Sequence, residues 1–84
     1  NTLIDTPVSA RHEDGTIVVV LESGVEFSFP CSVYPRLAAA AAAERANIEI
    51  SPMGLHWPDL DEDLSIRGLL RDHGQEAARL RIDA

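Results

Sequence analysis

Residues 54–65 read GLHWPDLDEDLS and carry the side chains of this chain that are best suited to chemistry. They include the only tryptophan, Trp57, with His56 beside it. Imidazole nitrogens and carboxylate oxygens bind metal ions and transfer protons. The same residues also suit the capped start of a helix, so two interpretations compete. Four carboxylates stand within five positions: Asp59, Asp61, Glu62 and Asp63.

The spacing of these residues argues against a metal or catalytic site. Calcium loops place oxygen ligands at alternating positions, turn at a glycine and close with a glutamate. Here the alternation ends after Asp61 and Asp63, and no glycine turn or closing glutamate follows. The single cysteine and the three histidines form no zinc pattern and no nucleophile–base pair. Metal-dependent or hydrolytic activity of His56 with the Asp59–Asp63 carboxylates therefore stands as an alternative only.

The helix-start interpretation explains more of the pattern. Asp59 with Glu62 three residues later resembles a capping box. The apolar stripe then slips in phase near Asp63–Ser65, so we expect Ser65 to cap a helix that runs to about Asp72. Gly74 is the expected stop of that helix.

His56 and Trp57 leave two interpretations open. In the first, Trp57 fills the core of an aromatic-poor chain, and His56 points to solvent or bonds a backbone group. In the second, Trp57 is a partly exposed interface anchor rimmed by carboxylates. The candidate partner-binding residues are His56, Trp57, Asp59, Asp61, Glu62 and Asp63.

The elements that position these residues begin with a β-meander. Val8–His12 alternates apolar and polar residues, and Thr16–Glu22 is β-branched almost throughout, as in a strand buried on both faces. Ser23-Gly24 predicts a tight hairpin at the second turn. Val25, Phe27 and Phe29 form the inward face of a third strand, which Pro30 ends.

An alanine-rich segment follows the meander. Residues 36–46 predict one or two helices, with Pro35 as the first helical residue, Leu37 as the packing contact and Asn47 as the C-cap. Short strands are expected at Ile48–Ile50 and at Leu55–Trp57.

Composition limits the function classes. The 84 residues predict a single α+β domain over residues 1–74 and a tail over residues 75–84 that frays, docks or adds an edge strand. Fourteen acids against seven arginines give a net charge of −7, which argues against direct nucleic-acid binding and favours a basic protein partner. One cysteine permits no internal disulfide, and no apolar run reaches membrane-spanning length. We expect a cytoplasmic protein without a cofactor.

Three stretches carry a family resemblance: GLHWPDLDEDLSIRGLL (residues 54–70), YPRLAAAAAAERAN (residues 34–47) and SGVEFSFP (residues 23–30). Together they resemble the bacterial family of domain of unknown function 2442. One departure is that relatives often have a Thr-Pro-type break where this chain is all alanine. The resemblance implies an α+β fold, no established catalysis, and genes often found beside a second small family, as in toxin–antitoxin-like pairs. Some relatives carry an additional helix-turn-helix domain.

We therefore predict an α+β fold in which a small antiparallel meander is extended by one or two short strands. An alanine-rich helix and a C-terminal helix are expected to pack on one face. The predicted function is a non-enzymatic protein-binding module, possible as a homo-oligomer, that acts as the antitoxin-like half of a two-gene pair. Besides the metal-dependent or hydrolytic alternative, a second alternative is a transcription-related accessory domain that acts through a DNA-binding partner.

Overall fold

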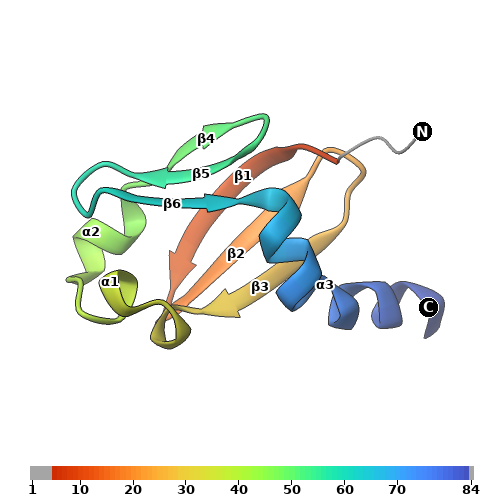
Figure 1. Ribbon diagram of the computed structural model, residues 1–84. Coiled ribbons are helices and arrows are strands. Elements are labelled where there is room, and N and C mark those ends of the chain that lie inside the picture. Colours follow the sequence, from red (N-terminus) through yellow and green to blue (C-terminus); the bar gives the residue numbers. More distant parts are fainter. Residues whose placement is uncertain (1–4, 84) are drawn as a thin grey trace.

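The computed structural model describes the backbone of residues 5–83 and the side chains of residues 5–74. The first half of the chain forms an antiparallel sheet, sheet A, with the order β1-β2-β3 (Figure 1). This confirms the predicted meander. In β2, Ile17 and Val19 are 0% exposed and Val18 is 7% exposed, so the middle of this strand is buried on both faces. The strands are β1 (Pro7–Glu13), β2 (Thr16–Leu21) and β3 (Glu26–Pro30).

The tight turn of sheet A is the first one. Asp14 (φ 48°) and Gly15 (φ 80°) connect β1 directly to β2, and positive φ at both positions is what a two-residue hairpin turn requires. His12 Nε2 accepts a hydrogen bond from the Gly15 N–H at 3.0 Å and stabilises this turn. The prediction of a tight hairpin at Ser23-Gly24 is wrong, because residues 22–25 form a longer connection between β2 and β3.

The later strands do not extend sheet A. They form a second antiparallel sheet, sheet B, with the order β4-β5-β6. The prediction of one or two further strands therefore missed one strand and the separate sheet, whereas the strand expected at Leu55–Trp57 is confirmed as β5. The strands are β4 (Glu49–Ser51), β5 (Gly54–Trp57) and β6 (Glu62–Ser65).

The alanine-rich segment forms two short helices, α1 (Pro35–Ala38) and α2 (Ala42–Ala46), after a 3-10 turn, η1 (Cys31–Val33). Pro35 begins α1 and Asn47 caps α2, as predicted. The break has a physical cause in Arg45, whose side chain donates to the carbonyl oxygens of Leu37 at 2.8 Å and Ala38 at 3.0 Å. Arg45 thus satisfies carbonyls at the end of α1 that a continuous helix would bond internally.

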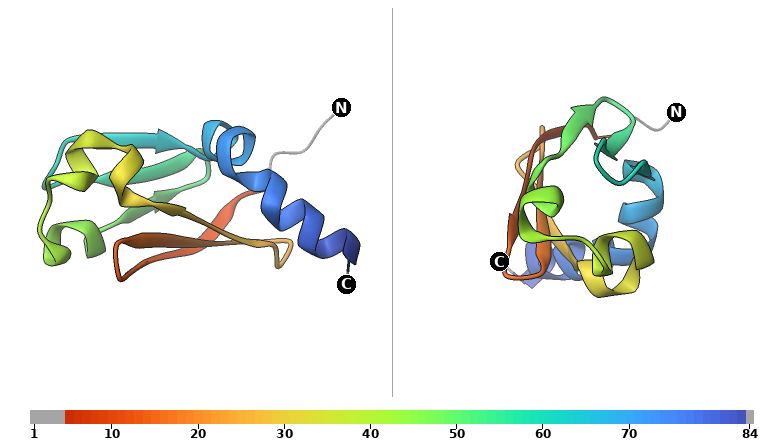
Figure 2. Two further views of the ribbon diagram at one scale, coloured as in Figure 1. Left: turned by 90° about the horizontal axis from the view of Figure 1, so that it is seen from below. Right: turned by 90° about the vertical axis from the view of Figure 1, so that its left-hand side faces the viewer.

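Helix α3 (Ile66–Asp83) begins where the sequence predicts. The Ser65 hydroxyl accepts a hydrogen bond from the Gly68 N–H at 3.0 Å, which is an N-cap bond. The predicted stop at Gly74 is wrong, because the helix continues through it. A glycine inside a helix costs only about 1 kcal/mol relative to alanine, and QEAARLR after it favours helix. The left view of Figure 2 shows the second half of α3 extending beyond sheet A. The predicted docking or fraying of residues 75–84 concerns side chains outside those described.

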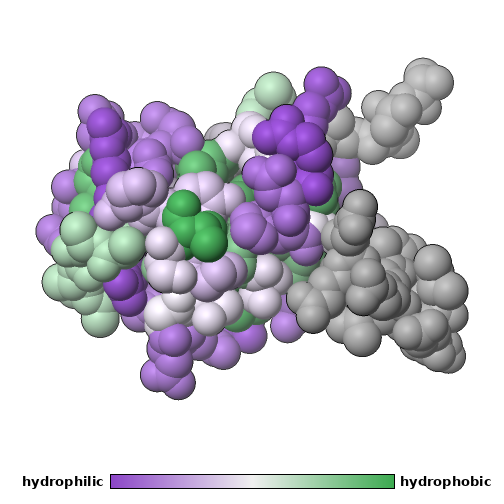
Figure 3. All heavy atoms as spheres, turned by 60° about the horizontal axis from the view of Figure 1, so that its bottom comes forward, coloured by the Kyte–Doolittle hydropathy of each residue, from purple (hydrophilic) through white to green (hydrophobic). Residues whose placement is uncertain are grey.

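The two sheets and the helices surround one hydrophobic core (Figure 2, right). Trp57 is its largest fully buried side chain, and Leu37 is the fully buried contact of α1. Most alanines of residues 38–43 are exposed and form the pale green area at the left of Figure 3. Among the described helices, none has the length and apolarity needed to cross a membrane.

Candidate functional site

Strand β5 separates a buried row of side chains from an outward one. Leu55 is 2% exposed and Trp57 is 0% exposed, so Gly54 and His56, which alternate with them, face outward. The Trp57 indole Nε1 donates to the Arg45 carbonyl oxygen at 3.0 Å. The interpretation of Trp57 as a core residue is therefore confirmed, and its interpretation as a partly exposed interface anchor is wrong.

The carboxylates that follow Trp57 do not start a helix. Asp59 and Asp61 lie in the turn between β5 and β6, and Glu62 and Asp63 lie in β6. The predicted capping box is wrong because Asp61 has φ 51°. Aspartate enters this left-handed region more easily than most residues, and the conformation reverses the chain into a hairpin.

The alanine-rich segment holds this turn in place. Asn47 Nδ2 donates to Asp59 Oδ2 at 3.0 Å, and the Arg36 side chain donates to the Asp61 carbonyl oxygen. The carboxylate of Glu62 lies 4.0 Å from Arg36, and its side chain is only 17% exposed. Glu62 is thus largely covered and paired, whereas the side chains of Asp59 and Asp61 lie on exposed residues.

A row of charged side chains crosses the outward face of sheet B. His56 pairs in register with Glu49 of β4 and with Asp63 of β6. His56 Nδ1 lies 2.8 Å from Asp63 Oδ1, and the Asp63 side chain is 77% exposed. The hydrogen bond from Asp63 raises the pKa of His56 above its ordinary value, and the negative charges of Asp63 and Glu49 act in the same direction. His56 thus points to solvent, as one interpretation predicted, and bonds a carboxylate.

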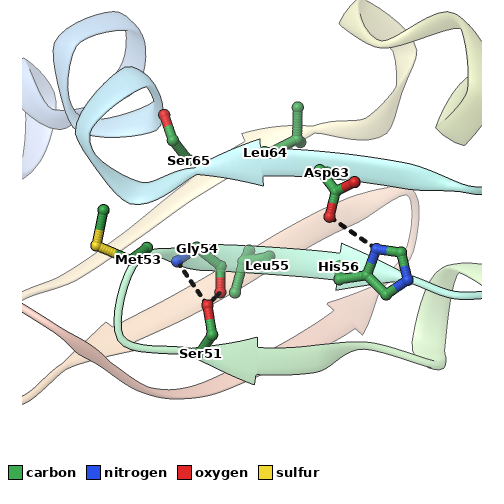
Figure 4. Close-up of a pocket in the computed structure, with 8 residues that line it drawn as sticks. All are labelled: Ser51, Met53, Gly54, Leu55, His56, Asp63, Leu64 and Ser65. Atoms are coloured by element: carbon green, nitrogen blue, oxygen red, sulfur yellow. Dashed lines mark hydrogen bonds and ion pairs between the residues drawn. The ribbon is translucent and has the colours of Figure 1, made fainter.

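An open hollow of about 230 Å³ lies next to this row (Figure 4). Gly54 forms part of its wall, because a Cβ there would lie 2.5 Å from the Leu64 carbonyl oxygen. The Ser51 hydroxyl accepts from the Gly54 N–H at 3.2 Å and donates to the Gly54 carbonyl at 3.4 Å. We call this feature the Gly54 hollow; it is also lined by Met53, His56, Asp63 and Ser65.

The hollow does not have the arrangement of a serine hydrolase. Such a site needs a serine hydroxyl at one imidazole nitrogen and a carboxylate at the other. His56 and Asp63 supply the second contact, but the Ser51 hydroxyl is bonded to the Gly54 backbone. Figure 4 shows His56 Nε2 on the side of the ring away from Ser51. Within the described part of the chain, no three His, Cys, Asp or Glu side chains are grouped so that they could hold a metal ion.

The other chemically reactive side chains lie elsewhere in the fold. His73 Nε2 lies 2.8 Å from the Tyr34 hydroxyl, and its ring stacks on Phe29 with centroids 5.3 Å apart. These contacts fix α3 against β3. Burial raises the pKa of the Cys31 thiol, which is 1% exposed. His73 and Cys31 therefore contribute to the core rather than to the outward face of sheet B.

Sequence reasoning found His56 and Asp63 but missed Glu49, Ser51 and Gly54. The missed residues join the site only through the register of β4 and β5. The usable signal was the alternation in Gly54–Trp57: once Trp57 is placed inward, His56 must face outward, and so must its neighbours on the adjacent strands.

Comparison with known proteins identifies relatives of undetermined function. Residues 7–73 match the family described as "Protein of unknown function (DUF2442)". A crystal structure of a protein of unknown function from Rhodospirillum rubrum is similar to this chain, with 32% sequence identity and a TM-score of 0.77. The similarity covers 83% of this chain and 89% of that chain. No curated protein matches this sequence.

Proposed function

This chain belongs to the DUF2442 family, and we propose that it is a protein-binding module that recognises a basic protein. The proposed docking surface is the outward face of sheet B together with the turn between β5 and β6. We call it the acidic face and define it by His56 and four acids. These acids are Glu49, Asp59, Asp61 and Asp63.

The row of Glu49, His56 and Asp63 is the observation that carries this proposal. It places two carboxylates beside an imidazole on a surface strand, and Asp63 is 77% exposed. The six outward positions of sheet B, all within the described residues, include no arginine. A surface with one sign of charge attracts a partner of the opposite sign and accelerates encounter.

The shape of the chain supports surface binding over an enclosed active site. Ligand pockets for small molecules measure roughly 300–1,000 Å³, and the Gly54 hollow measures about 230 Å³ and is open. On the face drawn in Figure 3, hydrophobic residues form small patches separated by hydrophilic ones. Charge rather than apolar area thus favours the acidic face as the place of recognition.

Two of the residues predicted to bind a partner have supporting roles in this proposal. Trp57 is buried beneath the acidic face, and Glu62 is largely covered beside Arg36. Their packing holds β5 and β6 in the register that pairs His56 with Asp63. Direct contact is assigned to the exposed acids and to His56.

In the cell we propose that the protein is cytoplasmic and acts as the neutralising half of a two-gene module. The family resemblance implies that such genes often stand beside those of a second small family, so the product of the adjacent gene is the first partner to test. A DNA-binding partner would instead make the chain a transcription-related accessory domain. Both roles use the same acidic face, and the partner's identity separates them.

The test is co-purification of the tagged chain with its partner from the native host, followed by surface-plasmon kinetics. The variant Glu49→Gln/Asp63→Asn removes two charges from the acidic face. The control Glu22→Gln/Glu26→Gln removes two charges next to and within sheet A. We expect the first variant to associate more slowly and with a weaker salt dependence, because exposed charges act mainly on the association rate and are screened within about 8 Å at physiological salt.

Circular dichroism of both variants serves as the folding control. A folded acidic-face variant that associates at the wild-type rate at two salt concentrations would refute the proposal. Equal slowing of both variants would also refute it, because it would show that net charge alone, and not this face, attracts the partner.

A further inference from the structure

We infer that the Gly54 hollow receives a single arginine side chain of the basic partner, with its guanidinium group against Asp63. This inference rests on the proposed function and names the side chain that the acidic face recognises. It follows from three properties of the hollow: its size, the unsatisfied oxygen of Asp63, and the apolar wall beside it.

The size of the hollow suits one side chain. Its volume of about 230 Å³ lies below the roughly 300–1,000 Å³ of small-molecule pockets. Gly54 keeps it open, because any Cβ at that position would lie 2.5 Å from the Leu64 carbonyl oxygen. The shape of the hollow is therefore fixed by backbone atoms rather than by flexible side chains.

The charge of the hollow selects a cation. Asp63 Oδ1 is bonded to His56, and Oδ2 has no hydrogen-bond partner among the described residues. Glu49 adds a second negative charge on the other side of His56. An incoming ligand that donates hydrogen bonds to Asp63 Oδ2 therefore gains both a partner and charge complementarity.

The wall of the hollow favours arginine over lysine. Met53 is 71% exposed at one side of the hollow and supplies apolar surface for an aliphatic stem. The imidazole ring of His56 supplies a flat surface at the other side (Figure 4). A guanidinium group is planar, stacks on flat groups and donates several hydrogen bonds in fixed directions, whereas an ammonium group is a compact point charge.

The His56–Asp63 bond makes this recognition dependent on pH. The charged groups that face His56 are Asp63 and the Glu62 backbone from β6, and Glu49 from β4. Protonated His56 neutralises Asp63 and repels a guanidinium. Binding of arginine is therefore weakest below the raised pKa of His56 and strengthens as the pH rises through it.

The direct test is a titration of the ¹⁵N-labelled chain with N-acetyl-arginine methylamide, followed by amide chemical shifts. N-acetyl-lysine methylamide and N-acetyl-citrulline methylamide are the controls, since citrulline has a similar shape without the charge. We expect shifts localised to Gly54, His56 and Ser65, a dissociation constant on the order of millimolar, and the order arginine, lysine, citrulline. Absence of localised shifts, or equal shifts with citrulline, would overturn the inference.

Two variants at the wall sharpen the test. Met53→Arg places a guanidinium of the chain itself beside the hollow, and Met53→Leu is the matched apolar control. We expect the arginine probe to bind at least fivefold more weakly to Met53→Arg and unchanged to Met53→Leu. Asp63→Asn should abolish the localised shifts. Equal binding to Met53→Arg and Met53→Leu would contradict occupation of the hollow.

The kinetic assay with the partner separates this inference from the proposed function. If Glu49→Gln/Asp63→Asn slows the partner but Met53→Arg does not, the acidic face is the docking surface and the inference about the hollow is wrong. If the probe binds at Asp63 but neither variant affects the partner, the hollow recognises a guanidinium group and the proposed function is wrong.

Discussion

Truncation of Trp57 tests the structural basis of the acidic face, because the whole of sheet B is built over this side chain. Trp57 is the only tryptophan and is 0% exposed. Trp57→Ala leaves a large cavity and removes the hydrogen bond to the Arg45 carbonyl oxygen. Truncation of a buried tryptophan typically costs about 3–5 kcal/mol. For 84 residues, a total stability of about 0.05–0.15 kcal/mol per residue gives only about 4–13 kcal/mol.

The assay is thermal and urea unfolding followed by circular dichroism, since tryptophan fluorescence is lost with the residue itself. In a domain of this size 1 kcal/mol shifts the Tm by about 4–8 °C, so we expect Trp57→Ala to lower it by about 12–40 °C or to leave the chain unfolded. Trp57→Phe retains an aromatic ring but loses the indole donor, and we expect a loss of about 1–3 kcal/mol.

The matched control is Met53→Ala, which truncates a side chain that is 71% exposed. Exposed substitutions usually change stability by less than about 0.5 kcal/mol. A Tm of Trp57→Ala equal to that of the control would show that Trp57 does not fill the core, and the placement of His56 on the outward face would lose its foundation.

Four further predictions concern the turn, the hollow, the imidazole and metal ions. Asp61→Gly should leave unfolding free energy unchanged or higher, and Asp61→Val should lower it by about 1–2 kcal/mol, because φ 51° suits glycine and not a β-branched residue; equal urea midpoints for the two variants would contradict the turn geometry. Gly54→Ala should cost about 1–3 kcal/mol in urea unfolding, since its Cβ meets backbone at 2.5 Å, and a neutral result would show that the strands can separate. The pKa of His56, followed by NMR, should lie above the ordinary histidine value and fall in Asp63→Asn; because the folded-state pKa is the raised one, the pair's contribution to stability is present at low pH and is lost as the pH rises through that pKa, and an unchanged titration in the variant would exclude the pair. Millimolar calcium, magnesium or zinc should leave the Tm within error, and a specific increase with one ion would restore the metal-site alternative, because a ligand that binds only the native state raises its stability.

Sheet A could be predicted from the sequence because its strands carry strong local signals. The β-branched run Thr16–Leu21 and the alternation of Val25, Phe27 and Phe29 determine which residues are inward without reference to the rest of the chain. The first turn was also signalled, since Asp14-Gly15 is a favoured two-residue hairpin sequence. The tight turn was assigned to Ser23-Gly24 instead, although both dipeptides suit a turn.

Sheet B could not be predicted in full because its strands have only three or four residues. In such short segments, Leu60 and Leu64 fit one helical turn as well as they fit a turn followed by a strand. The conformation of Asp61 decides between the two, and it is stabilised by Asn47 and Arg36 from the alanine-rich segment. Contacts distant in sequence thus override a local pattern that favours a helix start.

The same distinction separates the predictable part of the candidate site from the rest. Placing Trp57 in the core was enough to place His56 outward, because neighbouring residues of a strand face opposite sides. Its bond to Asp63, however, depends on the length of the intervening turn, since one more or one fewer residue would direct the carboxylate to the other face. A cross-strand pair is therefore a property of the register of β5 and β6, and the acids of residues 59–63 acquire different roles through it. Asp59 and Asp61 form the turn that sets the register, Glu62 is covered beside Arg36, and Asp63 alone is brought to the imidazole with one oxygen left for a partner.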